Sequence, residues 1–226
     1  LKAEAEAIGM RPVSAARLRD QGFLDSTTIL VQYQRATAQD REAMLETGAW
    51  NSIGALLPHL RGSIESDITN LVRMVNAGVN TCLSVDATPI STVNMFEIMR
   101  SLWHLGVPGG TIGHAQTGSH TSDNGANAGN AGTQTLVPIT LEQCLQMATI
   151  DGAHALGLGS VTGSLVPGKR ADVILVRTTD LNMVPAADPQ AALVCSGTVA
   201  NVDTVIVDGR VLKRGGRLIS ADVETV

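Results

Sequence analysis

The residue of this sequence best placed to do chemistry is Asp86. It follows the stretch "GVNTCLSV" of residues 78–85, which is mostly small and apolar and predicts a buried strand. In a sheet of parallel strands, functional side chains gather where strands end and loops lead into helices. Asp86 has that position, and Thr88 just beyond it is a candidate for orienting a water molecule or a substrate. The spacing alone leaves a second interpretation open, in which both residues only form the turn around Pro89.

Five histidines are further candidates for proton transfer or metal binding. No two of them form a His-x-His pair, and no combination has the spacing of a zinc site. Two lie on predicted helices and two in a polar loop, where surface or packing roles are the simpler interpretation. His59 lies near the expected active-site end of the predicted sheet, so it is kept as a candidate for binding substrate or metal. The other four are His104, His114, His120 and His154.

Trp50 and the cysteines complete the set of residues that could do chemistry. Trp50 is one of two tryptophans and is a candidate for stacking on a heterocyclic substrate, although burial is the simpler interpretation. Cys82, Cys144 and Cys195 lie in apolar runs without metal-type spacing. This pattern predicts buried free thiols in a reducing compartment, and therefore a cytoplasmic protein.

The composition argues against several kinds of partner. The chain has 226 residues, is 44% hydrophobic and carries a formal net charge of −5. A nucleic-acid-binding face needs clustered Lys and Arg, so we predict no nucleic-acid partner for this mildly acidic chain. No apolar run approaches the roughly 20 residues that span a bilayer, so we predict no membrane segment. The first residues, "LKAEAEAIGMRPV", resemble no signal or transit peptide and lack an initiator Met, so we expect a natural start upstream.

The segments that would position Asp86 alternate between strands and helices. β-branched and apolar runs predict strands, and amphipathic patterns with capping and stop residues predict helices between them. Strand, helix, strand, helix is the pattern of a parallel sheet with crossover helices. The predicted strands are 27–33, 49–56 and 79–85, and the predicted helices are 3–9, 12–24, 37–48, 66–78 and 94–106.

The second half of the chain has a different character. Residues 106–138 are rich in Gly, Asn, Thr and Ser and predict a long polar loop. A helix over 139–159 follows, and then short apolar runs that predict strands around 173–176 and on both sides of Asp208-Gly209, a strong hairpin signal. We therefore expect an α/β portion over 1–158, with the loop as an insertion, and a small β portion over 159–226.

Several stretches resemble one enzyme family. "NTCLSVDATPISTVNMFEIMR" is similar to the eighth barrel strand and following loop of the metal-dependent amidohydrolase superfamily. "GSLVPGKRADVILV" and "VDTVIVDGRVL" together resemble the return of those proteins into their β-sandwich. The resemblance covers nearly the whole chain except the insertion, and it is nearest to the cytosine deaminase, chlorohydrolase and adenosine-type deaminase branch.

The resemblance implies a fold and a reaction. The fold would be the C-terminal part of a (β/α)8 TIM-like barrel, followed by strands of a small β-sandwich. The reaction would be hydrolysis of carbon–nitrogen bonds other than peptide bonds, on a small nitrogen heterocycle or amide. A divalent metal, zinc or alternatively iron, would activate water, with Asp86 as metal ligand and proton shuttle. Gln32 stands where the family carries a metal-binding His, and an amide binds zinc far more weakly than an imidazole.

Gln32 leaves other interpretations open. The chain could be a degenerate relative without catalysis that serves as a scaffold or interaction module. It could also be an independent domain that captures a small ligand under the 106–138 insertion. Because a partial barrel leaves two strands without neighbours, we expect the chain to form homo-oligomers or to associate with the missing N-terminal half.

Overall fold

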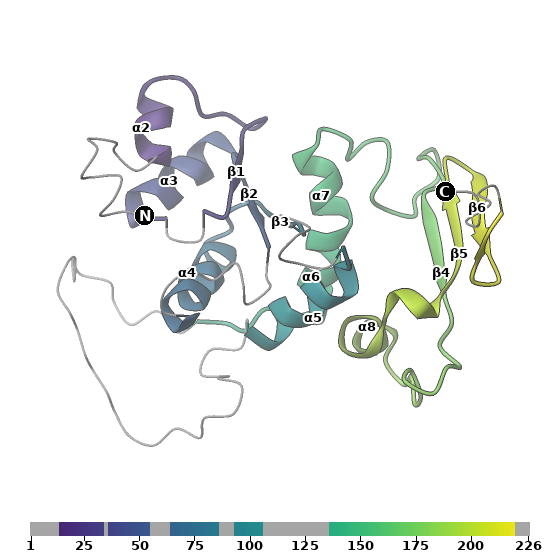
Figure 1. Cartoon of the computed structure of the whole chain (residues 1–226). Coiled ribbons are helices and arrows are strands. Elements are labelled where there is room, and N and C mark those ends of the chain that lie inside the picture. The colour runs from purple at the N-terminus through teal and green to yellow at the C-terminus, as the bar shows by residue number, and fades with distance from the viewer. Residues whose placement is uncertain (1–13, 34–35, 55–63, 86–92, 106–135, 220–226) are drawn as a thin grey trace, which may run out of the picture.

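The computed structural model describes residues 14–33, 36–54, 64–85, 93–105 and 136–219. These residues form a mixed α/β fold with one parallel and one antiparallel sheet. Figure 1 shows the parallel sheet among helices in one part of the molecule and the antiparallel sheet at the other side. The parallel sheet lies within residues 1–158 and the antiparallel sheet within residues 159–226.

The parallel sheet consists of β1 (Ile29–Val31), β2 (Trp50–Ile53) and β3 (Thr81–Leu83), in that order. Both neighbouring pairs run parallel, and Ser52 lies opposite Cys82. One helix follows β1 and another follows β2, which confirms the predicted strand–helix alternation. The helices among the described residues are α2 (Ala15–Asp20), α3 (Ala38–Thr47), α4 (Ile64–Asn76), α5 (Met95–Leu105), α6 (Leu141–Ala148), α7 (Ile150–Ala155) and α8 (Pro189–Ala191). The helix predicted over 3–9 lies outside the described residues.

Capping residues explain where two of these helices begin and end. At the start of α3, the Thr37 hydroxyl accepts from the Asp40 backbone N–H and the Asp40 carboxylate accepts from the Thr37 backbone N–H. Thr140 and Gln143 make the same reciprocal pair at the start of α6. Gly48 ends α3 with a φ of 72°, a left-handed conformation that favours glycine. The sequence signals for these ends are confirmed.

The helix predicted over 139–159 is divided into α6 and α7. The division falls at Thr149, whose φ of −130° and ψ of −91° are not helical. The Thr149 hydroxyl donates to the Leu145 carbonyl oxygen at 2.6 Å. Hydrogen bonds of this kind let Thr compete with the helical hydrogen-bonding pattern. The capping signals of the sequence did not reveal the break at Thr149.

One prediction for the parallel sheet is wrong in detail. The β-branched and apolar run over 27–33 predicts a buried strand, but Val31 is 60% exposed. The reason is its place in the sheet, because β1 is an edge strand of the three that the structure describes, whereas every residue of β2 and β3 is buried. The described strands form an open sheet, so the barrel remains an expectation from the resemblance.

The largest apolar core joins the two sheets. It contains Ile53 from β2, Val72 from α4 and Ile98 from α5, and it reaches Val194 and the first residue of the antiparallel strand that begins at Val202. On α5, the Arg100 guanidinium donates to the carbonyl oxygens of Cys195 and Gly197, which adds a polar link across the same junction. Apolar packing and this clamp fix α5 against the segment that leads into the antiparallel sheet.

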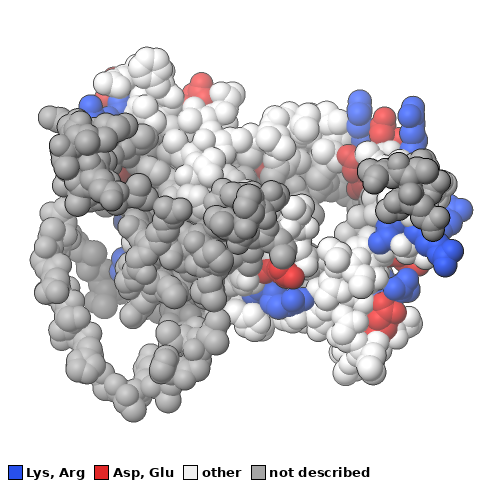
Figure 2. Space-filling view, viewed as in Figure 1, with Lys and Arg blue, Asp and Glu red and all other residues white. Residues whose placement is uncertain are grey.

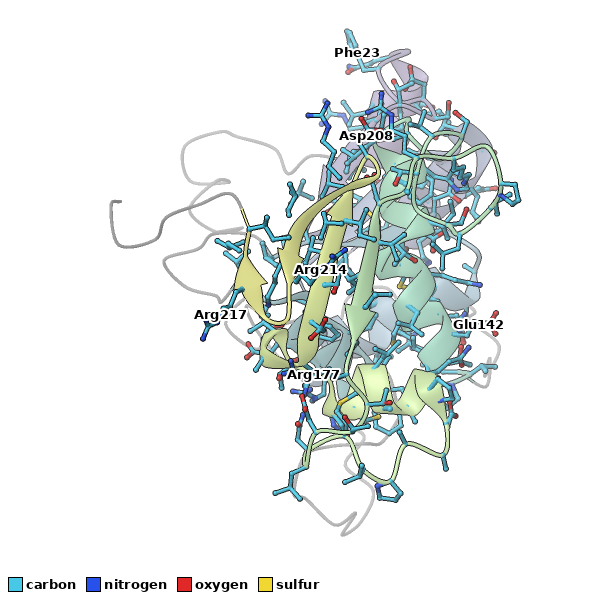
Figure 3. The ribbon with its side chains drawn as sticks, turned by 90° about the vertical axis from the view of Figure 1, so that its right-hand side faces the viewer. Phe23, Glu142, Arg177, Asp208, Arg214 and Arg217 are labelled. Atoms are coloured by element: carbon cyan, nitrogen blue, oxygen red, sulfur yellow. The ribbon has the colours of Figure 1, made fainter. Side chains whose placement is uncertain are left out.

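The antiparallel sheet consists of β4 (Val173–Val176), β5 (Val202–Val207), β6 (Arg210–Arg214) and β7 (Arg217–Leu218), in that order. Asp208 and Gly209 connect β5 to β6 with φ values of 50° and 75°, so the predicted two-residue hairpin is confirmed. Figure 3 shows this sheet with Arg214 and Arg217 on its outer hairpin.

Two surface properties bear on possible partners. Lys and Arg side chains gather at the end of the molecule that carries the antiparallel sheet, with Asp and Glu side chains interspersed (Figure 2). Within the described ranges, no helix combines the length and the apolar composition that crossing a membrane requires.

Candidate active site

The candidate site is the carboxyl end of the parallel sheet. Just beyond β1, the Gln32 backbone N–H donates to the Ser52 carbonyl oxygen at 2.9 Å. Just beyond β3, the Ser84 backbone N–H donates to the Ile53 carbonyl oxygen at 2.8 Å. Both hydrogen bonds end on β2, so Gln32 and Ser84 stand on either side of its last residues. Asp86, His59 and Thr88 lie outside the described residues.

Gln32 has an unusual backbone conformation. Its φ is 56°, in the left-handed region that residues other than glycine seldom adopt. Residues held in such conformations cost roughly 1–3 kcal/mol, and they cluster at functional sites. The side-chain oxygen of Gln32 is buried. The strained turn therefore coincides with the position at which the family resemblance expects a metal ligand.

Ser84 is a site residue that the sequence analysis did not select. The two faces of the sheet differ: Trp50, Cys82 and Ala155 pack together on one, here called the inner face, while Ile53 and Leu83 face the main core. Strand alternation puts Ser84 on the same face as Cys82. The Ser84 hydroxyl is buried and has no hydrogen-bond partner among the described residues, which is costly unless another group reaches it. The sequence signal that could have identified Ser84 is its position two residues before Asp86.

Near the amino end of the parallel sheet, the inner face is covered by apolar and aromatic side chains. Trp50 is 9% exposed, and its ring lies 6.4 Å from the His154 ring, centroid to centroid, at an angle of 47°. A side chain at Gly159 would overlap the His154 imidazole, so the loop packs against that ring. His154 is itself exposed and also packs against Trp50, in keeping with the surface or packing role expected for it. Burial raises the pKa of the Cys82 thiol, which opposes formation of a reactive thiolate.

Trp50 and Gln32 are not brought together. Trp50 begins β2 and pairs with Ile29 at the start of β1, whereas Gln32 follows the end of β1. Trp50 therefore lies at the amino end of the sheet, opposite the candidate site. It lines a hollow of about 160 Å³ that also involves Asp151, whose pKa is raised by burial. Nothing in the local sequence around Asp151 indicated this hollow, because its lining comes from distant segments.

The metal expectation can be tested against the side chains in place. Across the described ranges, no group of three or more His, Cys, Asp or Glu residues could hold a metal ion. Gln32 offers a neutral amide where zinc prefers an imidazole. The described residues therefore do not form a metal centre by themselves.

Comparison with known proteins decides the family. The sequence profile described as the amidohydrolase family matches residues 5–212. The chain belongs to the amidohydrolase family. The resemblance seen in the sequence is thereby confirmed.

The amidohydrolase relatives include named deaminases. The chain is 38% identical over 170 residues to 5-methylthioadenosine/S-adenosylhomocysteine deaminase of Desulforudis audaxviator, which covers 75% of this chain and 34% of the relative. It is 29% identical over 219 residues to the enzyme of the same name from Moorella thermoacetica, covering 96% and 45%. The chain thus spans less than half the length of these relatives.

Solved structures show the same fold. An adenosine deaminase from Xanthomonas campestris with bound zinc superposes with a TM-score of 0.75 over 99% of this chain and 45% of that one, at 21% identity. Atrazine chlorohydrolase TrzN from Arthrobacter aurescens, with zinc and atraton, gives 0.71 over 98% and 43%, at 17% identity. At these identities the likeness concerns the fold.

Proposed function

We propose that this chain is part of a hydrolase that removes the amino group of a nitrogen heterocycle, with a purine nucleoside as the substrate class. Water adds to the ring carbon that carries the amino group, the carbon–nitrogen bond breaks, and ammonia leaves as a ring carbonyl forms. The observation that carries the proposal is the match to deaminases over most of the chain. The strained Gln32 and the buried Ser84 hydroxyl at the carboxyl end of the sheet support it.

Asp86 is the proposed proton carrier. It follows Ser84, which lies at the proposed site, by two residues in the chain. The carboxylate of Asp is a common general base in enzymes. It is therefore able to accept a proton from the attacking water and return one to the departing amino group. The Ser84 hydroxyl, close by in the chain, would donate a hydrogen bond that orients this carboxylate or the substrate.

The proposal includes a divalent metal, zinc or alternatively iron. When bound, such a metal lowers the pKa of a coordinated water towards neutrality. Asp86 would supply one oxygen donor and Gln32 an amide oxygen. Imidazole donors would come from outside the described residues. His59 and Thr88 remain candidates for contacting the substrate, whereas Trp50 lies at the other end of the sheet.

The proposed assembly follows from the open sheet. β1 and β3 are the edge strands of the described parallel sheet, and edge strands present backbone groups that can pair with another chain. We therefore propose association with a second copy or with a segment that supplies the rest of a barrel. Light scattering of the purified protein at micromolar concentration would contradict this by reporting monomers.

The reaction is tested by ammonia release and metal content together. Purified protein is given 5′-methylthioadenosine or 5′-deoxyadenosine, and metal is measured by mass spectrometry. We expect Asp86→Asn to lower ammonia release about 100- to 10,000-fold, the range for loss of a general acid–base group. Glu42→Gln, which removes an exposed carboxylate on α3, is the matched control and should leave the rate unchanged. A rate unaffected by Asp86→Asn would rule out the proposed proton carrier.

A second candidate function is supported by Gln32 itself. An amide in place of an imidazole is what a non-catalytic scaffold relative would carry. If that is its role, Gln32→His raises the zinc content of a protein that otherwise binds none. If the chain is part of a working deaminase, the protein already contains metal and the substitution changes its amount little.

A further inference from the structure

The hollow at the amino ends of β2 and β3 lies away from the proposed reaction. It is formed by the first residues of these strands together with α6 and the start of α7. Its volume of about 160 Å³ is close to that of a cavity which accepts benzene, so it has room for a ligand of roughly six non-hydrogen atoms. The carboxyl end of the sheet, with Gln32 and Ser84, lies at the opposite end of the strands.

The hollow is lined by one ionisable residue, Asp151. In the part of the chain that the structure describes, no hydrogen bond or ion pair reaches the Asp151 carboxylate, and burial raises its pKa. His154 lies one turn further along α7, and its electrostatic interaction with Asp151 lowers the carboxyl pKa, but burial has the larger effect and raises it. A partly buried carboxylate is costly unless it is paired directly, and a cationic ligand would supply that pairing.

The neutral polar groups of the hollow include oxygens that can accept hydrogen bonds from a ligand. The Asn80 amide nitrogen donates to the Gly48 carbonyl oxygen at 2.9 Å, and the Gln146 amide nitrogen donates to Glu142 at 3.4 Å. The Thr81 hydroxyl donates to the Val79 carbonyl oxygen at 2.9 Å. Asn80 and Gln146 each retain an amide oxygen, and the Thr81 hydroxyl retains lone pairs, so all three side chains can accept a hydrogen bond from a ligand.

The remaining lining is suited to the apolar body of such a ligand. Trp50 and the buried Met147 contribute apolar surface. An indole face also attracts cations, by about 0.5–2 kcal/mol. The carboxylate and the indole together favour positive over negative ligands.

We propose that this hollow binds a small organic cation, an ammonium or amidinium group on an apolar body of about six non-hydrogen atoms in all. The carboxylate of Asp151 pairs with the charge, the oxygens of Asn80 and Gln146 accept its N–H groups, and Trp50 covers the apolar part. This site is independent of the deaminase proposal, because it uses the opposite end of the sheet and none of the residues placed in the reaction.

The test is a titration with n-butylammonium chloride, with butan-1-ol as its neutral counterpart of equal size. Trp50 fluorescence reports binding in a Trp103→Phe protein, and sodium chloride keeps the ionic strength constant. We expect a saturable change with butylammonium and at least about tenfold weaker binding of butan-1-ol, as expected for loss of a charge-assisted contact.

Two variants identify the carboxylate. Asp151→Asn keeps the volume, and Asp151→Ser keeps a residue that suits a helix start; each should weaken butylammonium binding at least about tenfold. Glu42→Gln removes the same charge from the surface of α3 and should bind as the parent does. Circular dichroism verifies that each variant is folded. Equal binding of butan-1-ol, or unchanged butylammonium binding by a folded Asp151 variant, would overturn the proposal.

Discussion

The two sheets of this molecule are held in place by different forces. Every residue of β2 and β3 in the parallel sheet is buried, and helices cover the face that bears Ile53 and Leu83. In the antiparallel sheet, β6 alternates between half-buried and exposed residues and β7 is exposed. Apolar burial therefore stabilises the first sheet, and the second has to rely more on polar contacts.

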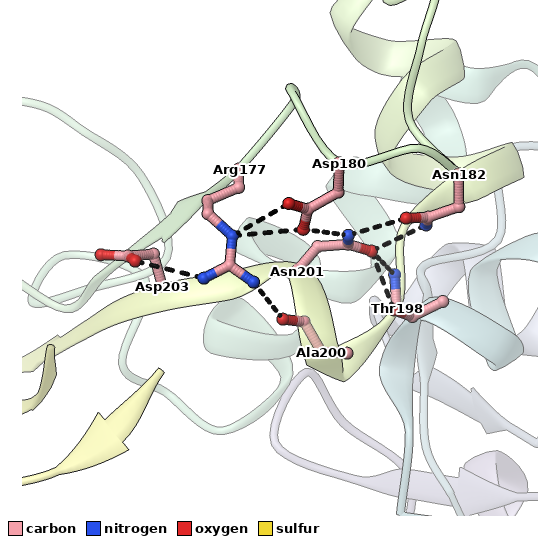
Figure 4. Close-up of polar contacts among 7 residues, drawn as sticks. All are labelled: Arg177, Asp180, Asn182, Thr198, Ala200, Asn201 and Asp203. Carbon is pink, nitrogen blue, oxygen red and sulfur yellow. Dashed lines mark hydrogen bonds and ion pairs between the residues drawn. The ribbon is translucent and has the colours of Figure 1, made fainter. Parts of the chain in front are cut away.

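Asn201 is the centre of those polar contacts. It is 2% exposed and lies just before β5. Its amide nitrogen donates to Asp180 and Asn182, and its amide oxygen accepts from Asn182 and from the backbone and hydroxyl of Thr198 (Figure 4). Arg177 extends the cluster to Asp180, Asp203 and the Ala200 carbonyl oxygen. A buried amide with all of these partners fixes the connection between β4 and β5.

The largest difference between the sheets is expected from removing an isoleucine. Ile53 on β2 is 2% exposed and Ile174 on β4 is 51% exposed. Ile53→Ala leaves a cavity in the main core and should lower the free energy of unfolding by about 3–5 kcal/mol. Ile174→Ala removes a half-exposed side chain and should lower it by about 1 kcal/mol. Urea unfolding followed by circular dichroism measures both, and equal losses would show that the antiparallel sheet is buried in solution.

For buried asparagines we expect a smaller loss of unfolding free energy, and here the larger loss should occur beside the antiparallel sheet. Asn201→Ala leaves several groups without partners and should cost about 2–3 kcal/mol. Asn51 in β2 is fully buried, and among the described residues its amide nitrogen donates to the Met74 sulfur and its amide oxygen accepts from the Tyr33 backbone N–H. Asn51→Ala should therefore cost less, about 1 kcal/mol. The same unfolding experiment ranks the two, and a larger loss at Asn51 would reverse the comparison.

Some parts of these two sheets were easier to predict from the sequence than others, because some depend on neighbouring residues and others on residues far apart in the chain. Local signals such as Thr37 with Asp40, or Asp208 with Gly209, act within four residues, so the elements they bound were predictable. The Asn201 cluster joins side chains up to 26 residues apart and could not be read from any one stretch.

The candidate site was likewise predictable only in part. Its place at a strand end followed from periodicity, and the family followed from resemblance. The left-handed backbone of Gln32 depends on how β1 meets β2, and the Ser84 hydroxyl, which has no partner among the described residues, depends on how β3 meets β2, so both required coordinates. The hollow around Asp151 joins strand starts to helices more than 60 residues later in the chain, and for the same reason the sequence did not reveal it.

The regions around the two sheets should lose stability at opposite ends of the pH range. Tyr33 lies beside α2, where its hydroxyl accepts from the Ala15 backbone N–H at 3.0 Å. Burial raises its pKa from 10.0 to about 12. The unfolded chain then releases this proton first, so the stabilisation is complete below pH 10 and is lost as the pH rises towards 12. We expect the free energy of unfolding to fall by about 1–2 kcal/mol over that interval.

The antiparallel sheet should respond on the acidic side instead. The hydrogen bond from Asn201 lowers the pKa of Asp180, and that from Thr204 lowers the pKa of Asp203. Their stabilisation is present above the ordinary carboxyl range and is lost as the pH falls through the lowered values. Trp fluorescence follows the α/β part, because the sequence has no aromatic residue after Trp103, and hydrogen exchange follows β4 to β7. Tyr33→Phe should abolish the alkaline loss and leave the acidic one. A Tyr33→Phe protein that still loses the same stability at high pH would assign that loss to other groups.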